Sequence, residues 1–475
     1  MAQWNSNTAN FLPQTKTLFE VNQIATIDGN PVTVDNRFPV DIGPEIEIKN
    51  DANSPLPISK NTTINSEVNP IWVKSTSDTS FFSPMQTDAF GRLRVSNPVT
   101  LFDSFHRYQD NGTFATAVNG VGSNATFSTN EGLVNLNIGT ASGSYVYRET
   151  TRVFAYQPGK SLLIYTTFVF NAPKENLRQR AGYFGVNNGF YLEANGTAIR
   201  FVKRTSVTGS PVNIVVEQAA WNVDPMDGTG PSGITLDPSK AQILFIDMEW
   251  LGLGTVRMGF VINGQIYLCH SFHHANILNT TYITTACLPL RLEIENTGAT
   301  DSASTMKQVC STVISEGGYE IRGRSRTLGL ATDGARDLAT AHTFYPVVSI
   351  RLKSTTPDCI VTPTGFSLLG KSTGNYQYKL VRQATITGGT WVALANSNVE
   401  YNISGTAITG GEDLESGYFS TTNQSGGFVP ASEDLFKYQL ERDSFTSTYY
   451  TFTLAVRSDG GGDDVYGSIN WQEIT

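Results

Sequence analysis

The sequence predicts an all-β protein, and its composition is the first reason. Only 16% of the 475 residues are charged, against the ~25% of an average soluble domain, while 11% are aromatic and 43 are glycine. Proteins built mainly from long surface helices rely on Glu, Lys, Ala and Leu. The aromatic content also excludes intrinsic disorder, which combines few aromatic residues with a high net charge. Composition therefore indicates a β-rich, turn-rich fold with a large buried core.

Alternating apolar and polar residues are the second reason. The runs TVRMGFVI and QIYLCHSF flank Asn263-Gly264, and an Asn-Gly pair favours a two-residue type I′ hairpin turn. On this hairpin Val256, Met258, Phe260 and Ile262 share one face. The same alternation places Leu288, Leu290, Leu292 and Ile294 inward and Arg291, Glu293 and Glu295 outward. Many such strands predict a concanavalin- or jelly-roll-like two-sheet sandwich over residues 101–320, in which only Pro173 to Ala181 resembles a helix.

The first hundred residues predict an extended arm. They hold nine of the 20 prolines but only three of the 43 glycines. Proline fixes φ and lacks an amide donor, which favours extended segments over compact domains. Because ordering each residue costs ~1–2 kcal/mol of backbone entropy, we expect residues 1–100 to become ordered by docking on a partner subunit.

A second, smaller β-sandwich is predicted for residues 344–475, after a Gly-, Arg-, Ala- and Thr-rich linker at 321–343. Turn clusters such as Thr387-Gly388-Gly389 separate its expected strands. These strands are Tyr345–Lys353, Tyr376–Arg382, Leu435–Glu441, Tyr449–Val456 and Val465–Trp471.

Charge and cysteine content exclude several classes of partner. The net charge is −9, which gives no general attraction to nucleic acid. The densest basic stretch, Arg322, Arg324 and Arg326, lies among glycines and serines and is interpreted as a solvated loop. Neither a membrane span nor a secretory leader is recognisable, so we expect assembly in a cytoplasm. The irregularly spaced Cys269, Cys287, Cys310 and Cys359 fit buried small side chains better than zinc ligands or a disulfide scaffold.

Paired carboxylates are the strongest hint of catalysis. Asp247 with Glu249, and Glu293 with Glu295, lie two residues apart and so share a strand face, at a separation of ~6.5–7 Å that suits sugar hydrolysis. Concanavalin-like hydrolases carry a third acid on the same strand, but here Leu251 stands at that position after Asp247 and Glu249. Solvent-facing alternation explains both pairs without chemistry, so we predict that the protein is not an enzyme.

Three further patterns are candidate binding sites. His270, His273 and His274 beside Cys269 are the one cluster of metal-type ligands, but a straight strand turns His273 away from the other two, which leaves metal binding open. Gly228, Gly230 and Gly233 match GxGxxG formally, although the neighbouring prolines indicate a loop. Trp221, Trp391 and Tyr418 lie near turns and could stack on sugar rings, while core packing is the alternative. No catalytic, cofactor-binding or metal-binding residue is therefore assigned, and no cofactor is expected.

Several segments resemble large structural proteins of tailed phages, particularly the myovirus-like phages of marine cyanobacteria. They are AFGRLRVSNPVTLFDSFHRYQDNG, VRMGFVINGQIYLCHSFHHAN, YITTACLPLRLEIEN, MKQVCSTVISEGGYE, FYPVVSIRLKS and LFKYQLERDSFTSTYYTFTLAV. The resemblance runs from about residue 85 to the end and brings no catalytic motif. It implies a virion component such as a fibre, decoration or tail-associated subunit, with other virion proteins as partners of the arm.

Two alternatives stay open beside the structural role. The first is a glycan-binding fibre that attaches to host surface polysaccharide, and the second is a polysaccharide depolymerase. We expect a homo-oligomer, preferably a trimer, because cyclic symmetry closes an interface and prevents open polymerisation. Nucleic-acid binding and membrane insertion are not expected.

Overall fold

The computed structural model describes residues 72–74, 82–84, 97–320, 322–331, 333–421 and 438–474. The chain divides into two compact units, residues 1–95 and 96–475. In the first unit, the described strands β1 (Trp72–Lys74) and β2 (Phe82–Pro84) pair antiparallel with each other. Of the rest of the predicted arm at 1–100, residues 97–100 are described, with a strand beginning at Val99, and the other residues lie outside the described part of the chain.

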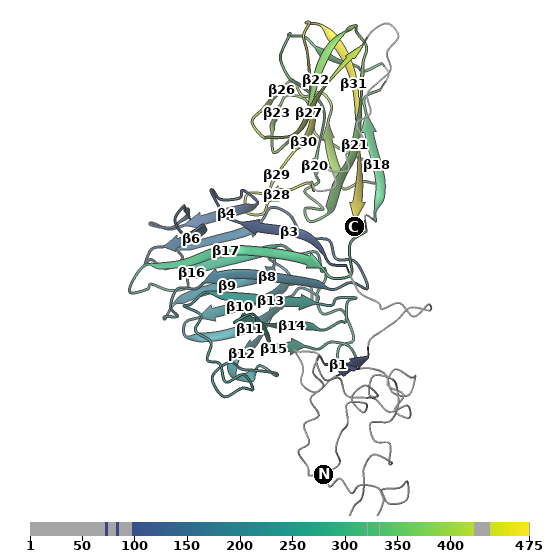
Figure 1. Ribbon diagram of the computed structural model, residues 1–475. Helices are drawn as coiled ribbons and strands as arrows, with labels where there is room; N and C mark the ends of the chain where they lie inside the picture. Colours follow the sequence, from purple (N-terminus) through teal and green to yellow (C-terminus); the bar gives the residue numbers. More distant parts are fainter. Residues whose placement is uncertain are drawn as a thin grey trace, which may run out of the picture. The chain divides into compact units, whose positions relative to one another are not determined.

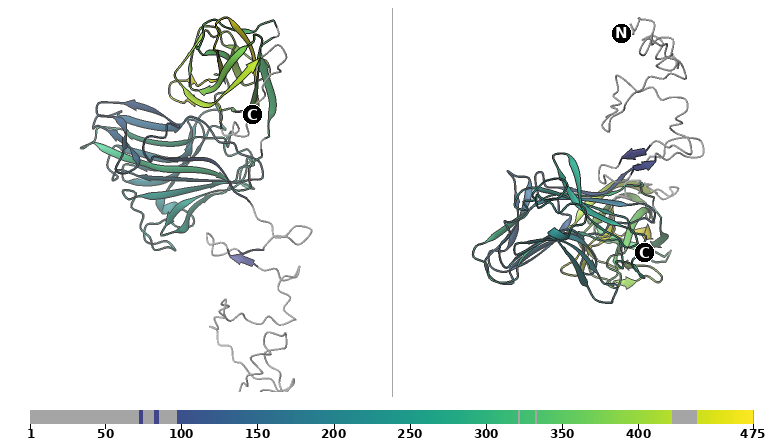
Figure 2. Two further views of the ribbon diagram at one scale, coloured as in Figure 1. Left: turned by 45° about the horizontal axis from the view of Figure 1, so that its top comes forward. Right: turned by 90° about the horizontal axis from the view of Figure 1, so that it is seen from below.

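The second unit contains a large β-sandwich made of two antiparallel sheets (Figures 1 and 2). The seven-stranded sheet contains, in spatial order, β12 (Val212–Glu217), β11 (Ala198–Thr205), β10 (Gly189–Asn195), β9 (Leu177–Phe184), β16 (Leu290–Asn296), β7 (Tyr145–Thr150) and β4 (Phe114–Asn119). The eight-stranded sheet contains β15 (Gln265–Phe272), β14 (Val256–Ile262), β13 (Gln242–Met248), β8 (Leu162–Val169), β17 (Ser304–Ser315), β6 (Leu133–Ile138) and β5 (Asn124–Ser128), with β3 (Val99–Phe105) also paired to β17.

A smaller β-sandwich follows in the same unit. Its six-stranded sheet contains, in order, β24 (Val392–Ala393), β25 (Val399–Asn402), β20 (Tyr345–Leu352), β30 (Phe452–Ser458), β22 (Gly374–Arg382) and β27 (Glu412–Thr421). Its four-stranded sheet contains β18 (Arg324–Gly329), β19 (Arg336–Leu338) and β21 (Ile360–Gly370), all paired with β31 (Asp463–Ile474). Two small ribbons join β23 (Thr385–Thr387) to β26 (Ala407–Thr409) and β28 (Arg442–Asp443) to β29 (Thr448–Tyr449). The predicted all-β fold with two sandwiches is confirmed.

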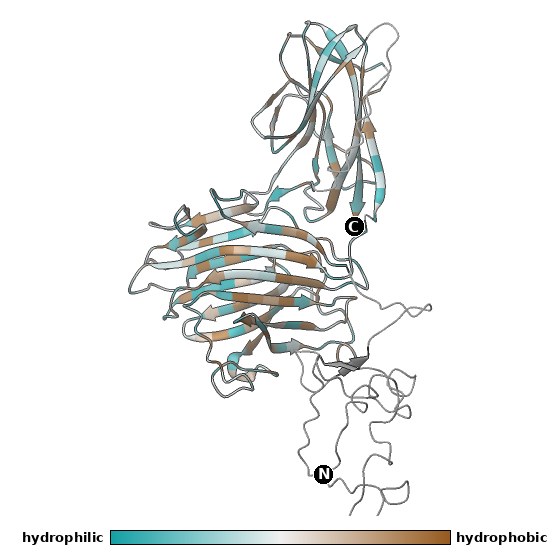
Figure 3. Ribbon diagram, in the orientation of Figure 1, coloured by the Kyte–Doolittle hydropathy of each residue, from teal (hydrophilic) through white to brown (hydrophobic). Residues whose placement is uncertain are grey.

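Each sandwich has its own hydrophobic core, formed by the alternating apolar residues of its strands (Figure 3). Phe168, Leu244 and Phe260 belong to the first core, and Leu454 and Trp471 belong to the second. Burial of these side chains supplies the main driving force for both sandwiches, at about 1.5–3 kcal/mol for each large apolar side chain. The first core holds the two sheets face to face and so leaves the other side of each sheet available for a site.

The predicted hairpin is confirmed in detail. Ile262 pairs with Gln265, and Asn263 and Gly264 adopt φ values of +52° and +75°, as a type I′ turn requires. Leu288, Leu290, Leu292 and Ile294 all point into the core, as their spacing predicts.

Local sequence misled the prediction at three places. Residues 173–181 are not helical, because β9 begins at Leu177 and is paired along both sides, with β10 and β16. Residues 324–329 and 336–338, inside the expected linker 321–343, form β18 and β19; their polar, half-exposed residues lack the apolar signal of a strand. This also places Arg324 and Arg326 on a strand instead of a loop. Residues 438–441, the described part of the strand expected at 435–441, lie outside any strand.

Among the described residues, the one helical element is a three-residue 3-10 turn at Gln218–Ala220. No helix in this part of the chain has the length and apolar character that a membrane crossing requires.

Candidate functional site

The outer face of the seven-stranded sheet, opposite its core side, carries a continuous row of charged residues. Strand pairing places Glu293 of β16, Arg180 of β9, Glu193 of β10, Arg200 of β11 and Glu217 of β12 directly opposite one another in succession. Directly paired residues lie on the same face of an antiparallel sheet, with their Cβ atoms ~5 Å apart. The row therefore crosses five strands with charges of alternating sign.

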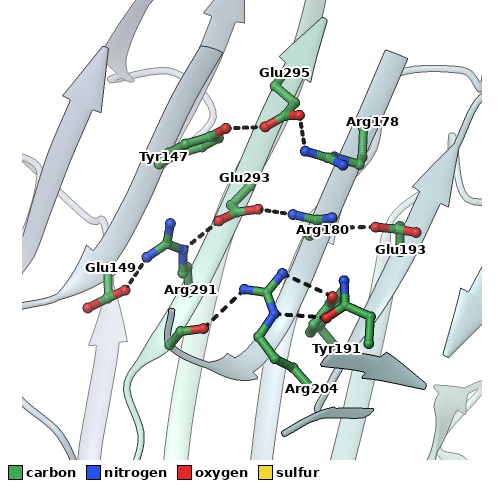
Figure 4. Close-up of polar contacts among 12 residues, drawn as sticks. Tyr147, Glu149, Arg178, Arg180, Tyr191, Glu193, Arg204, Arg291, Glu293 and Glu295 are labelled. Atoms are coloured by element: carbon green, nitrogen blue, oxygen red, sulfur yellow. Dashed lines mark hydrogen bonds and ion pairs between the residues drawn. The ribbon is translucent and has the colours of Figure 1, made fainter. Parts of the chain in front are cut away.

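These side chains form an unbroken series of ion pairs, and Figure 4 shows the part of it from Glu293 through Arg180 to Glu193. Arg180 Nη1 donates to Glu293 Oε2 at 2.9 Å, and Arg180 Nε donates to Glu193 Oε2 at 2.7 Å. Glu193 Oε1 lies 3.3 Å from Arg200 Nη1, and Arg200 Nε lies 2.9 Å from Glu217 Oε1.

The series continues in the other direction through Arg291. Its Nε donates to Glu293 Oε1 at 2.6 Å, and its Nη1 donates to Glu149 Oε2 at 2.5 Å. We call the complete set the charge ladder, and it consists of Glu149, Arg291, Glu293, Arg180, Glu193, Arg200 and Glu217.

Most of the charge ladder is buried, although it lies outside the sandwich core. Glu293 is 3% exposed, and Glu149, Arg180, Glu193 and Arg291 are buried as well. Guanidinium groups pack over aromatic rings of the same face, with Arg180 5.3 Å from the ring centre of Tyr191 and Arg291 5.4 Å from that of Tyr147. Cation–π packing of this kind shields both the charge and the ring from water. Only the end of the ladder at Arg200 and Glu217 opens toward solvent.

The electrostatics keep Glu293 ionised. Burial by itself would raise its pKa, but the charges of Arg291 and Arg180, together with their hydrogen bonds, lower it below its usual value. The carboxylates of Glu293 and Glu193 in turn raise the pKa of Arg180, although burial by itself would lower it. Glu295 accepts hydrogen bonds from Tyr147 and Arg178. Glu293 is therefore not a free proton donor at neutral pH.

The sequence interpretation of Glu293 and Glu295 as solvent-facing residues is wrong. They share a face, as predicted, but that face is a packed polar layer and Glu293 is buried within it. The one local sign of this packed polar layer in the sequence was the charged residues at every second position of β9 and β16. The Arg180–Glu293 pair joins residues 113 positions apart, so sequence spacing could not reveal it.

The second candidate pair, Asp247 and Glu249, is bridged by an arginine. Arg257 Nη1 donates to Asp247 Oδ2 at 2.8 Å and to Glu249 Oε1 at 3.0 Å. Arg257 lies directly opposite Asp247 on the neighbouring strand β14. Burial raises the pKa of Asp247 although the hydrogen bond and charge of Arg257 oppose it. A guanidinium thus occupies the position between the carboxylates where hydrolysis would place the glycosidic bond.

The three histidines do not converge. The Nδ1 atom of His270 accepts a hydrogen bond from the Asn222 amide at 3.2 Å, while His274 Nδ1 donates to the Gly254 carbonyl oxygen at 2.6 Å. His273 is exposed, with its Nδ1 3.4 Å from Thr255 Oγ1. Burial lowers the pKa of both His270 and His274 to about 4. Within the described residues, no group of three or more His, Cys, Asp or Glu side chains is placed to share a metal ion.

The candidate sugar-stacking aromatics differ sharply in exposure. Trp221 belongs to the first core and stacks on Phe201 with ring centres 4.2 Å apart, so core packing is the alternative that holds for this residue. Trp391 is half-buried, with the guanidinium of Arg351 4.2 Å from its ring centre. Tyr418 is 75% exposed and remains a candidate.

The remaining sequence patterns have structural explanations. Gly228 and Gly233 have positive φ in a loop, so the formal GxGxxG match is not a nucleotide-binding turn. Arg322 is exposed and pairs with Glu320. All four cysteines are free; Cys269 is buried in the first core, as predicted, while Cys287, Cys310 and Cys359 are half-buried.

Comparisons with known proteins place the chain in no family. Neither protein-family models nor curated sequences give a match. Three similar solved structures are the Emp47p carbohydrate recognition domain (9% identity, 48% of this chain and 99% of that chain, TM-score 0.31), arcelin-5, a lectin-like defence protein from Phaseolus vulgaris (11%, 46% and 99%, 0.29), and a carbohydrate esterase from Shiga toxin-encoding bacteriophage phi24B (13%, 46% and 100%, 0.29). At such identities and TM-scores the likeness carries no argument about ligand or activity.

Proposed function

We propose that this protein is a structural subunit of a tailed-phage particle and performs no catalysis. The observation that carries this proposal is the state of its four candidate catalytic carboxylates, each of which is engaged by an arginine. A sugar hydrolase needs one protonated acid and an open gap between its two carboxyl groups. Here ion pairing supports a rigid sheet surface, which suits a load-bearing or tiling subunit.

The phage context of the proposal rests on the sequence resemblance from about residue 85 onward. The sandwiches of residues 97–474 supply a folded body, and residues 1–84 are the expected docking segment. The particle would be assembled in the host cytoplasm, with the arm bound to other virion proteins.

Deletion of residues 1–84 tests this role. We expect the shortened protein to keep its β-sheet circular dichroism, because the unit formed by residues 96–475 contains both cores, and yet to be missing from purified particles in mass spectrometry. Normal incorporation of the shortened protein would contradict docking through the arm. Release of reducing ends from host polysaccharide by the full-length protein, abolished by Glu249→Gln, would contradict the non-catalytic role.

Attachment to a host glycan is the second candidate function, and Tyr418 favours it. Strand pairing places Tyr418 of β27, Gln377 of β22 and Arg457 of β30 in one row on the outer face of the six-stranded sheet. The neighbouring Tyr376 and Phe419 stack on each other at 4.9 Å on the core side. With strands ~4.8 Å apart, the row is about 10 Å wide.

The Tyr418 row combines stacking and hydrogen-bonding groups. Arg457 Nε donates to Gln377 Oε1 at 2.7 Å, its Nη1 donates to the His342 carbonyl oxygen at 3.4 Å, and its guanidinium lies 4.9 Å from the ring centre of Phe344. An apolar sugar face could pack on the Tyr418 ring while hydroxyl groups bond to the amide and guanidinium.

Substitution of the exposed tyrosine tests glycan binding. We expect Tyr418→Ala to weaken binding to the host polysaccharide about tenfold, since an aromatic contact is worth up to about 1.5 kcal/mol. Glycan arrays followed by calorimetry would measure the effect. Tyr108→Ala is the matched control, because Tyr108 is equally exposed but lies on the first sandwich. Equal affinity of the Tyr418→Ala and wild-type proteins, or no binding to any glycan at millimolar concentration, would contradict this candidate function.

A further inference from the structure

Strand β12 ends the seven-stranded sheet with an unpaired edge. It pairs with β11 on one side and with no described strand on the other. Its sequence is VNIVVE, and every residue except Val216 is exposed. The exposed fractions of Val212, Ile214 and Val215 are 47%, 43% and 42%. An apolar strand thus faces solvent along an edge that no described strand pairs, and of its carbonyl groups that of Val216 accepts a hydrogen bond from Trp221 Nε1 at 3.3 Å.

Edges of this kind are uncommon in proteins that stay monomeric. Natural sheets protect their edges with lysines, prolines, bulges or very short strands, because a free apolar edge recruits another strand. Within its six residues β12 has no such device, and its single charge is at the last residue, Glu217. The opposite edge strand of the same sheet, β4, contrasts with it because Phe114 and Ala115 at its start are buried. The pairing capacity of the sheet is therefore concentrated at β12.

We infer that β12 pairs antiparallel with β12 of a second copy of this chain, around a two-fold axis at Val215. In an antiparallel pair, directly opposite residues lie on the same face of the sheet. Successive residues of β12 alternate between the two faces, so the numbers of two opposite residues are both even or both odd, and their sum is even. A register centred on Val215 places it opposite its own copy, Ile214 opposite Val216 and Asn213 opposite Glu217. All apolar residues from 214 to 216 then meet apolar residues.

Polar complementarity selects this register and this partner. Asn213 Oδ1 accepts a hydrogen bond from Arg204 Nε at 3.0 Å, which leaves the Nδ2 protons of Asn213 available. Glu217 Oε1 is bound to Arg200 at 2.9 Å, which leaves its Oε2 available. Asn213 of each copy can therefore donate to Glu217 of the other, twice per dimer. Hydrogen bonds to a charged acceptor are stronger than those between neutral groups.

Neighbouring registers are poorer. A register centred on Ile214 places Asn213 opposite Val215 and Glu217 opposite Pro211, which has no amide proton. A register centred on Glu217 places like charges directly opposite each other, which is destabilising. Pairing at Val215 is isologous, so it closes after two copies, in place of the trimer preferred from the sequence, and joins the two seven-stranded sheets edge to edge. It also brings the solvent-open ends of the two charge ladders together.

Cysteine cross-linking of the full-length protein tests the pairing and its register. We expect Val215→Cys to give a disulfide-linked dimer under mild oxidation on a non-reducing gel, since residue 215 lies opposite itself. Ile214→Cys is expected to cross-link at least tenfold less, because its opposite residue is Val216. Val186→Cys is the matched control: Val186 is an exposed valine in the loop between β9 and β10 and not on β12. The wild-type protein, with its four natural cysteines, gives the background.

Light scattering after size exclusion provides an independent measurement. Val215→Lys is expected to halve the molar mass of the protein in solution, from dimer to monomer, because edge lysines block strand addition. Val186→Lys is expected to leave the molar mass unchanged. Unchanged circular dichroism shows that both variants fold. A wild-type protein of 51.7 kDa at 100 μM would overturn the inference. It would also be overturned by a mass insensitive to Val215→Lys, or by equal cross-linking at residues 214 and 215.

Discussion

Replacing Arg180 with methionine is expected to lower the free energy of unfolding by about 3–5 kcal/mol. Arg180 is buried and bonds Glu293 and Glu193 at once, at 2.9 and 2.7 Å. Methionine keeps much of the side-chain volume but leaves two buried carboxylates with one cation fewer each. Removing one member of a buried ion pair costs more than the pair contributes, because the charge that remains is poorly solvated. Urea unfolding followed by tryptophan fluorescence measures the difference.

A surface arginine provides the control for this prediction. Arg322 pairs with Glu320, but its side chain is 78% exposed. Arg322→Met is expected to change the free energy of unfolding by less than about 1 kcal/mol, because solvent screens exposed pairs. A loss of less than 1 kcal/mol for Arg180→Met as well would mean that water solvates the charge ladder, and the description of this face as a packed layer would be wrong.

Acidification from pH 6.5 to pH 4 is expected to destabilise the protein through His270 and His274. Both have pKa values of about 4 in the folded protein because burial disfavours the charged ring, against ~6.5 in an unfolded chain. The unfolded state therefore binds more protons between these pH values. The stability that the neutral rings provide is complete above pH 6.5 and is lost as the pH falls. Linkage gives a loss of about 3 kcal/mol for each histidine by pH 4.

Comparison of variants separates the histidines from the carboxylates, which also titrate in acid. The double variant His270→Gln/His274→Asn is expected to lose several kcal/mol less than wild type between pH 7 and pH 4 in urea unfolding. The control is His342→Asn, because His342 is exposed and lies between β19 and β20, outside the group of His270, His273 and His274, and it should follow the wild-type pH profile. Parallel profiles of the double variant and the wild-type protein would show that neither buried ring titrates between these pH values.

The sequence by itself determined the features that depend on near neighbours in the chain. Period-two alternation fixed which side of β14 and β16 faces the core, since successive side chains of a strand point to opposite faces. Asn263-Gly264 fixed a hairpin turn, because both residues tolerate positive φ. The composition fixed the all-β class. Each of these signals is contained in a few consecutive residues.

Only the tertiary structure decided what the outer faces of the sheets do. Glu149 and Arg291 are 142 residues apart, and their contact depends on the order and register of strands that the local pattern does not encode. The same holds for Arg257, which closes the gap between Asp247 and Glu249, and for Trp221, which a turn-rich segment delivers into the core. A charged residue at every second position indicates a face outside the core. Whether that face is solvated, paired or buried depends on which strands lie beside it, because Coulomb energy and desolvation act through space and not along the chain.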